Sequence, residues 1–283
     1  MKYNILTHDG KAHMDELLAI ALIAIHNGEE PANIERRQSQ AVSDAVAAGN
    51  IPENTWLVDV GLVYDPERNL YDHHQDGSLD CSALQIFSRF FPHLKGTELD
   101  EYIQLVSKVD NQGIKSLNDW RLIDESKSYW SFTHSLLLRL FERDPWPSLR
   151  LVIEGLKDRI DFEQKIAEGV KWLSDPHNIE IINVAGINVI KYLKQPPEDL
   201  ISATRSADAS IIEKHDIIAT YSFDDRDPKS RILFRTNRGA ERVDFNKAAP
   251  AKSLFCHKGG FLLRFVPDSD REWLKLIESS IVT

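Results

Sequence analysis

The stretch YNILTHDGKAHMDELLAIALIAIHNG, residues 3–28, decides the fold. Residues 3–8 have the composition of a short β-strand. Residues 14–26 predict a helix that is apolar nearly all round, so we expect it to be buried. The Asn27-Gly28 pair that follows is a usual helix stop. The chain therefore opens with a strand, a polar turn and a buried helix.

The same alternation continues through the next sixty residues. Two further strands are predicted over residues 33–38 and 55–61, and a shorter extended piece over 69–72. Helices are predicted over residues 39–48 and 82–91, the first of them stopped by Gly49-Asn50. Strands that alternate with helices favour an α/β fold with a mostly parallel sheet covered by helices.

The pattern changes twice further along the chain. Residues 98–172 are mainly helical, with a break at Asp144-Pro145-Trp146-Pro147 and a long charged helix after it. After Asp175-Pro176 the composition becomes β-type, over residues 180–184, 187–193, 217–223 and 231–236, with a helix near 207–214. We therefore expect a first α/β domain over residues 1–145, a helical connector over 146–175 and a smaller α+β domain over 176–283.

Composition excludes several classes of protein. The chain has 283 residues, 42% of them apolar, and only two cysteines, which rules out a disulfide framework. Its longest apolar run, Leu17 to Ile25, is far shorter than the ~20 residues of a membrane helix. The N-terminus shows no signal-peptide pattern. These observations predict a cytoplasmic protein without a membrane partner.

Charge is unevenly distributed. The whole chain carries −10, but residues 226–258 hold nine Lys and Arg against three Asp and Glu, a local charge of +6. An acidic protein is a poor non-specific binder of duplex nucleic acid, because phosphate contacts need clustered cations. The basic segment is either a solvated surface or a site for a small anionic ligand.

Carboxylates and imidazoles gather at the ends of the early strands. They are His8, His13 and Asp15 in the first strand–helix turn, Asp59 after the third strand, the triplet Asp72-His73-His74, and Asp110. In an open α/β sheet the carboxyl ends of the strands form the ligand site. Such donors suit Mn²⁺, Zn²⁺ or Co²⁺, and their number suffices for two cations with one shared carboxylate.

Each of these residues also has an ordinary structural explanation. Asp15 favours a helix N-terminus by its charge, and Asp59 before Val60-Gly61 fits a turn. Taken together these explanations weaken, because carboxylates at one sheet edge repel each other unless cations neutralise them. The sequence thus predicts a metal site, whose two cations would stabilise displacement at phosphorus.

The motifs resemble the DHH phosphoesterase superfamily. The segments THDGKAHMDE (7–16), VDVG (58–61), YDP (64–66), YDHHQ (71–75) and VDN (109–111) are similar to one branch of it, the melanocyte-proliferating-gene (Myg) family. That family is described as metal-dependent hydrolases and, for its eukaryotic members, as 3′–5′ RNA exonucleases. Beyond residue 120 the resemblance rests on the segment FCHKGGF, residues 255–261.

The resemblance implies two divalent cations, of the Mn²⁺ type, with Mg²⁺, Co²⁺ or Zn²⁺ as alternatives. By analogy, His8, His13 and Asp59 hold one cation, and Asp15, Asp59, His73 and Asp110 hold the other. His74 would face the substrate phosphate and Asp72 would orient the histidines, which gives these two the catalytic roles. The nucleophile would be a water activated by both cations.

The resemblance also gives the basic segment a role in substrate binding. The candidates are Arg231, Arg235, His257, Lys258, Gly259 and Gly260. Phe234 and Phe261 are either base-stacking residues or, as we favour, core residues. The sequence differs from the family pattern at Asp9, at Gln38, at Cys81 and at Leu262-Leu263, and the changes at Gln38 and Leu262-Leu263 bear on specificity more than on metal binding.

Three functions remain open at this point. The first is a metal-dependent phosphodiesterase or 3′–5′ exonuclease acting on short RNA or dinucleotides. The second is a phosphomonoesterase or pyrophosphatase built on the same first domain. The third is a non-enzymatic sensor of metal or nucleotide, and a homodimer is compatible with all three.

Overall fold

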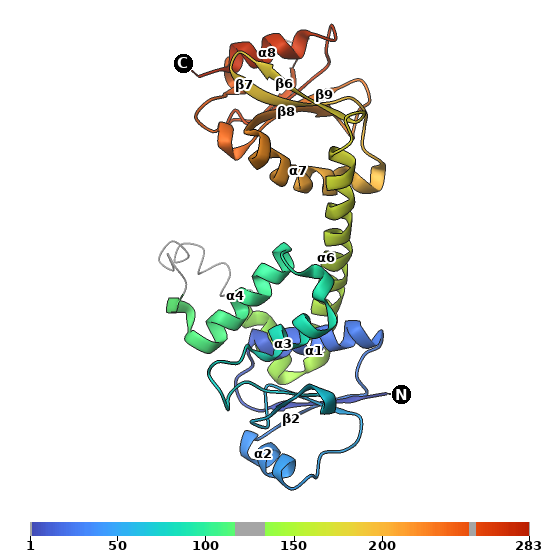
Figure 1. Cartoon of the computed structure of the whole chain (residues 1–283), viewed down its shortest axis with the longest axis vertical. Coiled ribbons are helices and arrows are strands. Elements are labelled where there is room, and N and C mark those ends of the chain that lie inside the picture. Colours follow the sequence, from blue (N-terminus) through green and yellow to red (C-terminus); the bar gives the residue numbers. More distant parts are fainter. Residues whose placement is uncertain (1, 117–133, 249–252, 283) are drawn as a thin grey trace. The chain divides into compact units, whose positions relative to one another are not determined.

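The computed structural model describes residues 2–116, 134–248 and 253–282 (Figure 1). The chain divides into two compact units, Met1–Asp161 and Phe162–Thr283. Both mix sheet and helix, so the predicted α/β class is confirmed. The finer prediction of a separate connector over residues 146–175 stays a prediction.

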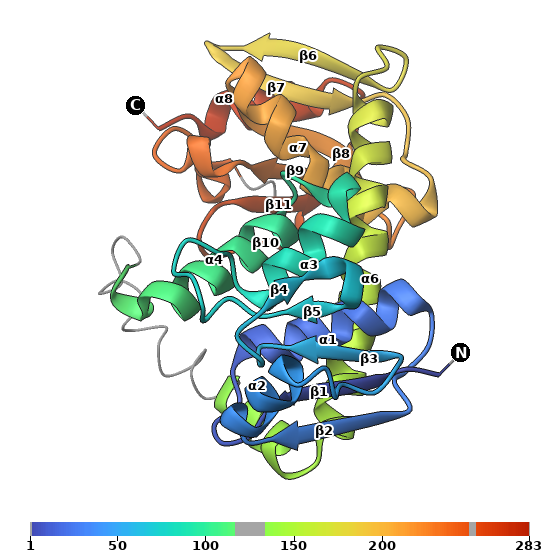
Figure 2. The same ribbon diagram turned by 60° about the horizontal axis from the view of Figure 1, so that its bottom comes forward.

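A five-stranded sheet in the order β2-β1-β3-β5-β4 forms the centre of the first unit (Figure 2). Its strands are β1 (Asn4–His8), β2 (Asn33–Arg37), β3 (Thr55–Val58), β4 (Tyr64–Asp65) and β5 (Leu70–Tyr71). The β1–β2, β1–β3 and β3–β5 pairs are parallel, and β4 pairs antiparallel with β5. The carboxyl ends of β1, β3 and β5 therefore meet at one edge.

Helices cover both faces of this sheet. They are α1 (Met14–Asn27), α2 (Ser39–Ala47), α3 (Ser82–Phe90) and α4 (Glu98–Gln112). Figure 1 shows α2 on the opposite face from α1. Leu6, Leu57 and Leu70 pack with Val42 of α2, whereas Ile5, Val58 and Tyr71 belong to the large core around α1. This core is why α1 is apolar nearly all round.

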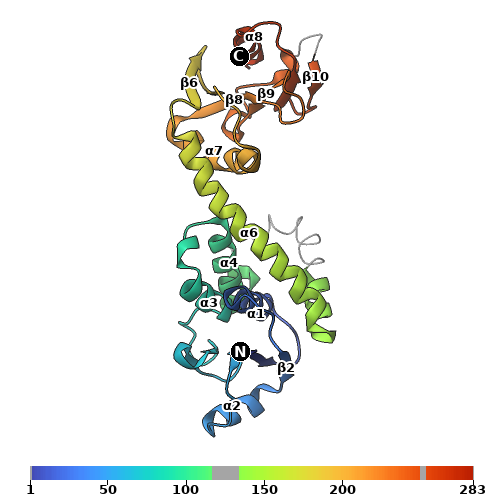
Figure 3. The same ribbon diagram turned by 90° about the vertical axis from the view of Figure 1, so that its right-hand side faces the viewer.

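A single long helix, α6 (Pro145–Leu173), runs from the first unit into the second (Figure 3). Residues 134–143 are also helical, and Asp144 separates them from α6. The predicted break thus occurs, although α6 begins at Pro145, whose missing N–H and fixed φ suit the first turn. Of the predicted helical stretch 98–172, residues 117–133 lie outside the described part.

The second unit is built on a six-stranded sheet in the order β10-β11-β9-β8-β7-β6. Its strands are β6 (Ile179–Val184), β7 (Ile187–Tyr192), β8 (Ile217–Phe223), β9 (Arg231–Arg235), β10 (Ser253–Cys256) and β11 (Leu262–Phe265). The β7–β8 pair is parallel and the others are antiparallel. Helix α7 (Ile201–His215) covers one face and α8 (Glu272–Ser280) the other (Figure 1).

Short 3₁₀ helices connect several of these elements. They span Pro66–Arg68, Pro92–Leu94, Ile114–Ser116, Glu198–Leu200, Asn237–Gly239 and Phe245–Lys247. The sequence analysis did not predict β4, β10, β11 or α8, and it placed the start of α7 six residues late. Among the described helices, none has both the length and the apolar composition that crossing a membrane requires.

Candidate metal centre

His8 stands at the end of β1, and the loop after it is fixed by buried charges. The Arg36 guanidinium donates to the carbonyls of His8 and Gly10, and to Glu16 at 3.3 Å. Glu16 also accepts from the Thr7 hydroxyl at 2.8 Å and from the backbone N–H of His13 at 3.1 Å. The loop is thereby held so that both of its histidines face the end of β3.

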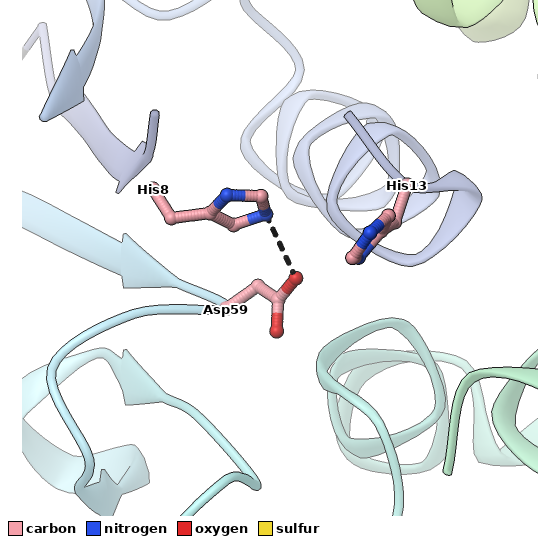
Figure 4. Close-up of side chains that lie close together, drawn as sticks. All are labelled: His8, His13 and Asp59. Atoms are coloured by element: carbon pink, nitrogen blue, oxygen red, sulfur yellow. Dashed lines mark ion pairs between the residues drawn. The ribbon is translucent and has the colours of Figure 1, made fainter. Parts of the chain in front are cut away.

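Asp59 follows β3 directly and occupies the centre of the cluster. Its backbone has φ of 56°, a left-handed conformation that costs a non-glycine residue free energy. One carboxylate oxygen, Oδ2, lies 3.3 Å from His8 Nε2 (Figure 4), and the other, Oδ1, lies 3.2 Å from His73 Nε2. Asp59 therefore lies between two imidazoles that come from different strands.

The triplet after β5 carries two differently oriented imidazoles. Asp72 Oδ1 accepts from the His74 Nδ1–H at 2.8 Å and from the backbone N–H of His73 at 2.7 Å. His73 in turn donates from Nδ1 to the Asn111 amide oxygen at 2.8 Å. Because each Nδ1 carries the hydrogen of its bond, the Nε2 lone pair of each ring is free for a cation. His74 is half exposed, whereas His73 is buried.

Asp15, His13 and Asp110 complete the cluster. Asp15 in the first turn of α1 accepts from the backbone N–H groups of Ser82 at 3.2 Å and Ala83 at 2.6 Å, at the start of α3. His73 Nε2 lies 3.2 Å from Asp110 Oδ2 and 3.9 Å from Asp15 Oδ2. His13 Nδ1 lies 3.8 Å from Asp110 Oδ1. All six predicted metal ligands thus meet at one edge of the sheet.

The donor atoms form three overlapping groups, each within 4.8 Å: His8, His13 and Asp59; Asp59, His73 and His74; and Asp15, His73 and Asp110. Both oxygens of Asp59 and the Nε2 atoms of His8 and His73 are buried and have no hydrogen-bond partner among the described residues. His8 donates from Nδ1 to the Asp9 carbonyl at 2.6 Å, so its neutral ring aims a lone pair at a carboxylate. Such an arrangement needs a proton or a cation between the atoms, so the donor set fits divalent cations.

The pKa values of the cluster show that its buried carboxylates repel one another and favour protonated histidines. Burial, together with the charges of Asp59 and Asp110, raises the pKa of Asp15 to about 7. Burial lowers the pKa of both His8 and His73, but nearby carboxylates outweigh it. Asp59 and Glu16 raise the pKa of His8 to about 9, and Asp110 and Asp59 raise that of His73 to about 11. Without a cation, protons balance the carboxylates.

Two residues of the site were quoted in the motifs but given no role by the sequence. Glu16 joins Arg36, Thr7 and the loop, and its Oε1 lies 3.6 Å from His8 Nε2. Asn111 fixes the ring of His73 and donates its own amide to the Leu79 carbonyl at 3.1 Å. The only available signal was their position in the sequence: Glu16 directly follows Asp15, and Asn111 directly follows Asp110. Their partners come from distant parts of the chain.

The predicted substrate residues lie in the second unit, around the β10–β11 turn. Gly260 has φ of 65°, and a Cβ there would collide with the Asp244 carboxylate, so only glycine fits. Arg235 donates to the carbonyls of Val243 at 2.7 Å, Ala240 at 3.2 Å and Gly259 at 3.3 Å. Gly259 donates its backbone N–H to His257 Nδ1 at 3.0 Å. Arg235 thus stabilises the turn in the described structure.

Other predicted substrate residues are more accessible. Lys258 at the tip of the turn is exposed, and its carbonyl accepts from the Asn246 amide at 3.0 Å. The Arg231 guanidinium lies over the Phe223 ring, 4.5 Å from its centroid. Phe234 is 40% exposed, so the expectation that it packs in the core is wrong. It lies near the end of β9, and the rings of Phe234 and Phe261 are 5.9 Å apart between centroids, edge to face.

The first unit thus has an α/β sheet at whose strand ends carboxylates and imidazoles come together in an arrangement that fits divalent cations. Residues 4–84 match the family model MYG1_exonuc, described as an uncharacterised protein family (UPF0160). The chain is 42% identical over 69 residues to MYG1 exonuclease of Bos taurus and 41% identical over 69 residues to that of Homo sapiens. It is 37% identical over 73 residues to MYG1 protein of Dictyostelium discoideum. The predicted resemblance to the Myg family is confirmed for this segment.

These matches are local. They cover 24–26% of this chain and only 16–20% of the length of the relatives. Among solved structures, RecJ of Thermus thermophilus in complex with Mn²⁺ overlaps 97% of this chain and 51% of its own, at 13% identity and a TM-score of 0.31. A likeness at this level carries no argument about the site.

Proposed function

We propose that the chain is a metal-dependent phosphoesterase that uses two divalent cations, Mn²⁺ in particular. One observation carries the proposal. Two imidazole Nε2 atoms and both oxygens of one carboxylate are buried, face each other and have no hydrogen-bond partner among the described residues. Protein interiors avoid unpaired polar atoms, so this arrangement indicates that cations bind there.

The overlapping groups of donor atoms support the ligand set that the family resemblance implies. His8, His13 and Asp59 would hold one cation, and Asp15, Asp59, His73 and Asp110 would hold the other, with Asp59 shared. Once bound, such a pair supplies an acidified water and neutralises the charge that develops on the phosphate. Asn111 would hold the His73 ring in the tautomer that leaves Nε2 free, and the carbonyl of Asp9 would do so for His8.

His74 and Asp72 would act on the substrate side. Asp72 is buried and accepts from the backbone N–H groups of Leu62, His73 and His74 as well as from the His74 ring. These bonds hold a half-exposed imidazole beside the cluster, with Nε2 directed away from Asp72. The bond to Asp72 raises the pKa of His74, and in the protonated ring that nitrogen can donate a hydrogen bond to a phosphate oxygen. No side chain is needed as a covalent nucleophile.

The substrate we propose is a phosphodiester of short RNA or of a dinucleotide. Two curated relatives are named exonucleases, and residues 226–258 carry a net positive charge of +6. Aromatic rings accompany that charge: His257 lies tilted against Phe261 at 4.0 Å between centroids, and the exposed ring of Phe255 lies 6.3 Å from that of His257. Rings beside cations suit a nucleic-acid strand better than inorganic pyrophosphate.

Hydrolysis of bis-p-nitrophenyl phosphate and of short oligoribonucleotides, with and without Mn²⁺, tests this function. We expect Mn²⁺-dependent turnover that Asp59→Asn abolishes. Asp44→Asn is the matched control, since Asp44 is an exposed carboxylate on α2 that bonds only Gln40 in the described structure. Turnover without metal, or equal turnover in Asp59→Asn, would refute the proposal. Stable metal binding without any hydrolysis would favour a sensor.

A further inference from the structure

The second unit contains a cavity of about 470 Å³ between α7 and the sheet face that α7 covers. Strand register shows how the floor is built. Thr220 of β8 pairs with Phe234 of β9, which pairs with Leu262 of β11. The next row along is Ser222 beside Ile232. These residues share the face opposite to Tyr221, which stacks on Trp273 of α8, and Thr204 of α7 closes the other side.

Two hydroxyls in this floor lack partners. Thr220 is only 5% exposed, and in the part of the chain that the structure describes neither its hydroxyl nor that of Ser222 makes a hydrogen bond. Other buried hydroxyls of this unit are paired: Thr236 donates to the Ile217 carbonyl at 2.9 Å, and Ser230 donates to Asp224 at 2.6 Å. Neither hydroxyl is among the buried unpaired polar atoms of the described residues, so both are accessible from the cavity, where a ligand with hydrogen-bonding edges can reach them.

An aromatic ring and two cations complete the cavity. Phe234 is 40% exposed although its strand neighbours Ile232 and Leu233 are buried. At the rim, Arg205 pairs with Asp225 at 3.5 Å, and Arg226 donates from Nε to Asp224 at 3.2 Å while most of its side chain stays in solvent. The cavity thus offers a flat ring, hydroxyls beside it and two guanidinium groups at its mouth, each paired with an aspartate.

The geometry points to a binding pocket for one nucleoside of the substrate, with its base against Phe234, its polar edge at Thr220 and Ser222, and its phosphate towards Arg205 and Arg226. A volume of about 470 Å³ lies within the usual range of small-molecule sites. Stacking of a base on an aromatic ring is a main contribution to the binding of single-stranded nucleic acid, and the two guanidinium groups at the entrance can exchange an aspartate for a phosphate. The choice of a nucleoside over another planar ring rests on the proposed phosphodiesterase function.

Calorimetric titration of the full chain with adenosine 5′-monophosphate, in the presence of a chelator so that no metal contributes, tests the pocket. We expect Phe234→Ala to weaken binding about tenfold or more, since base stacking on a ring is worth that much. Thr220→Val should weaken it about fivefold, as the loss of one hydrogen bond does. Ile181→Ala is the control, because Ile181 is 39% exposed on β6 of the same sheet and should leave binding unchanged.

Thermal melting separates a ligand role from a structural one. Because the Thr220 hydroxyl has no partner among the described residues, Thr220→Val should not lower the melting temperature of the free protein, and Thr220→Ser should retain most of the binding. A lower melting temperature with unchanged binding would assign Thr220 to folding alone and overturn the inference. Failure of adenosine 5′-monophosphate to bind, or binding that both variants leave intact, would do the same.

Two further ligands test which part of the nucleotide the pocket binds. Adenosine should bind and compete with its monophosphate, whereas inorganic phosphate alone should not; competition by phosphate alone would show an anion site in place of a nucleoside pocket. Hydrolysis of bis-p-nitrophenyl phosphate reports on the metal centre separately. Nucleotide binding without any hydrolysis would contradict the proposed function but keep the pocket, and hydrolysis without nucleotide binding would contradict the pocket alone.

Discussion

Binding of two cations at the cluster should release protons, and the number of protons follows from the structure. Without metal, His8 with a pKa of about 9 and His73 with a pKa of about 11 both carry a proton at pH 8. A metal ligand must be a neutral imidazole, so filling the site displaces both protons. Asp15, with a pKa of about 7, is mostly ionised at pH 8 and adds little.

The size of the effect is measured as the change of metal affinity with pH. Release of two protons means that the overall association constant for two Mn²⁺ rises about 100-fold per pH unit near pH 8. The sign is fixed by the direction of the shifts: both imidazole pKa values are raised, so acid favours the protonated, metal-free form. The same protons stabilise the metal-free fold below pH ~6.5, and this stabilisation is lost as the pH rises through about 9 and then about 11.

Calorimetry measures the release directly. Titration with Mn²⁺ in two buffers that differ in ionisation enthalpy gives the number of protons from the difference in apparent binding enthalpy. We expect release of about two protons at pH 8 for the unchanged chain. For His8→Asn we expect about one, because the asparagine side chain carries no proton for the metal to displace. An affinity that does not change with pH, or the same proton count in His8→Asn, would refute the reasoning.

Three further predictions concern single residues. His74→Ala should lower kcat while elemental analysis still finds two metals per chain, and loss of metal would show that His74 is a ligand. Lys258→Ala should raise KM more than it lowers kcat, since an exposed cation at the turn contributes ground-state contacts; an equal fall in kcat with KM unchanged would contradict this. Gly260→Ala should destabilise the chain by about 1–3 kcal/mol in chemical denaturation, because its φ is 65° and its Cβ would collide with Asp244; unchanged stability would contradict this.

Most of the first 90 residues were predictable because their signals are local, whereas the two-residue strand β4 is too short to leave a pattern. Residues 14–26 are apolar and end at Gly28, and the helix observed ends at Asn27 with Gly28 left-handed. His8, Asp59 and His73 converge because they follow neighbouring parallel strands, while helices α1 and α4 add Asp15 and Asp110. The roles of Glu16 and Asn111 could not be predicted from the sequence, because their partners lie on other elements.

The second half was less predictable because its elements also depend on contacts with distant parts of the chain. Residues 201–206 contain β-branched and hydroxyl side chains that do not favour a helix, yet α7 begins at Ile201. Its backbone at Ala203 and Thr204 lies against Gly169 of α6, where a Cβ would come within 3.1–3.2 Å. This contact is tertiary and leaves no local pattern. Strands β10 and β11 have four residues each and flank a glycine turn, which gives little periodicity to detect.

Anomalous scattering at the manganese edge, from crystals grown with Mn²⁺, tests the central claim most directly. The account predicts two peaks ~3.5–4 Å apart on either side of the Asp59 carboxylate, the usual spacing of a paired centre. One peak should lie within bonding distance of His8 and the other within bonding distance of His73. No peak in this region, or a single peak that does not touch Asp59, would contradict the account.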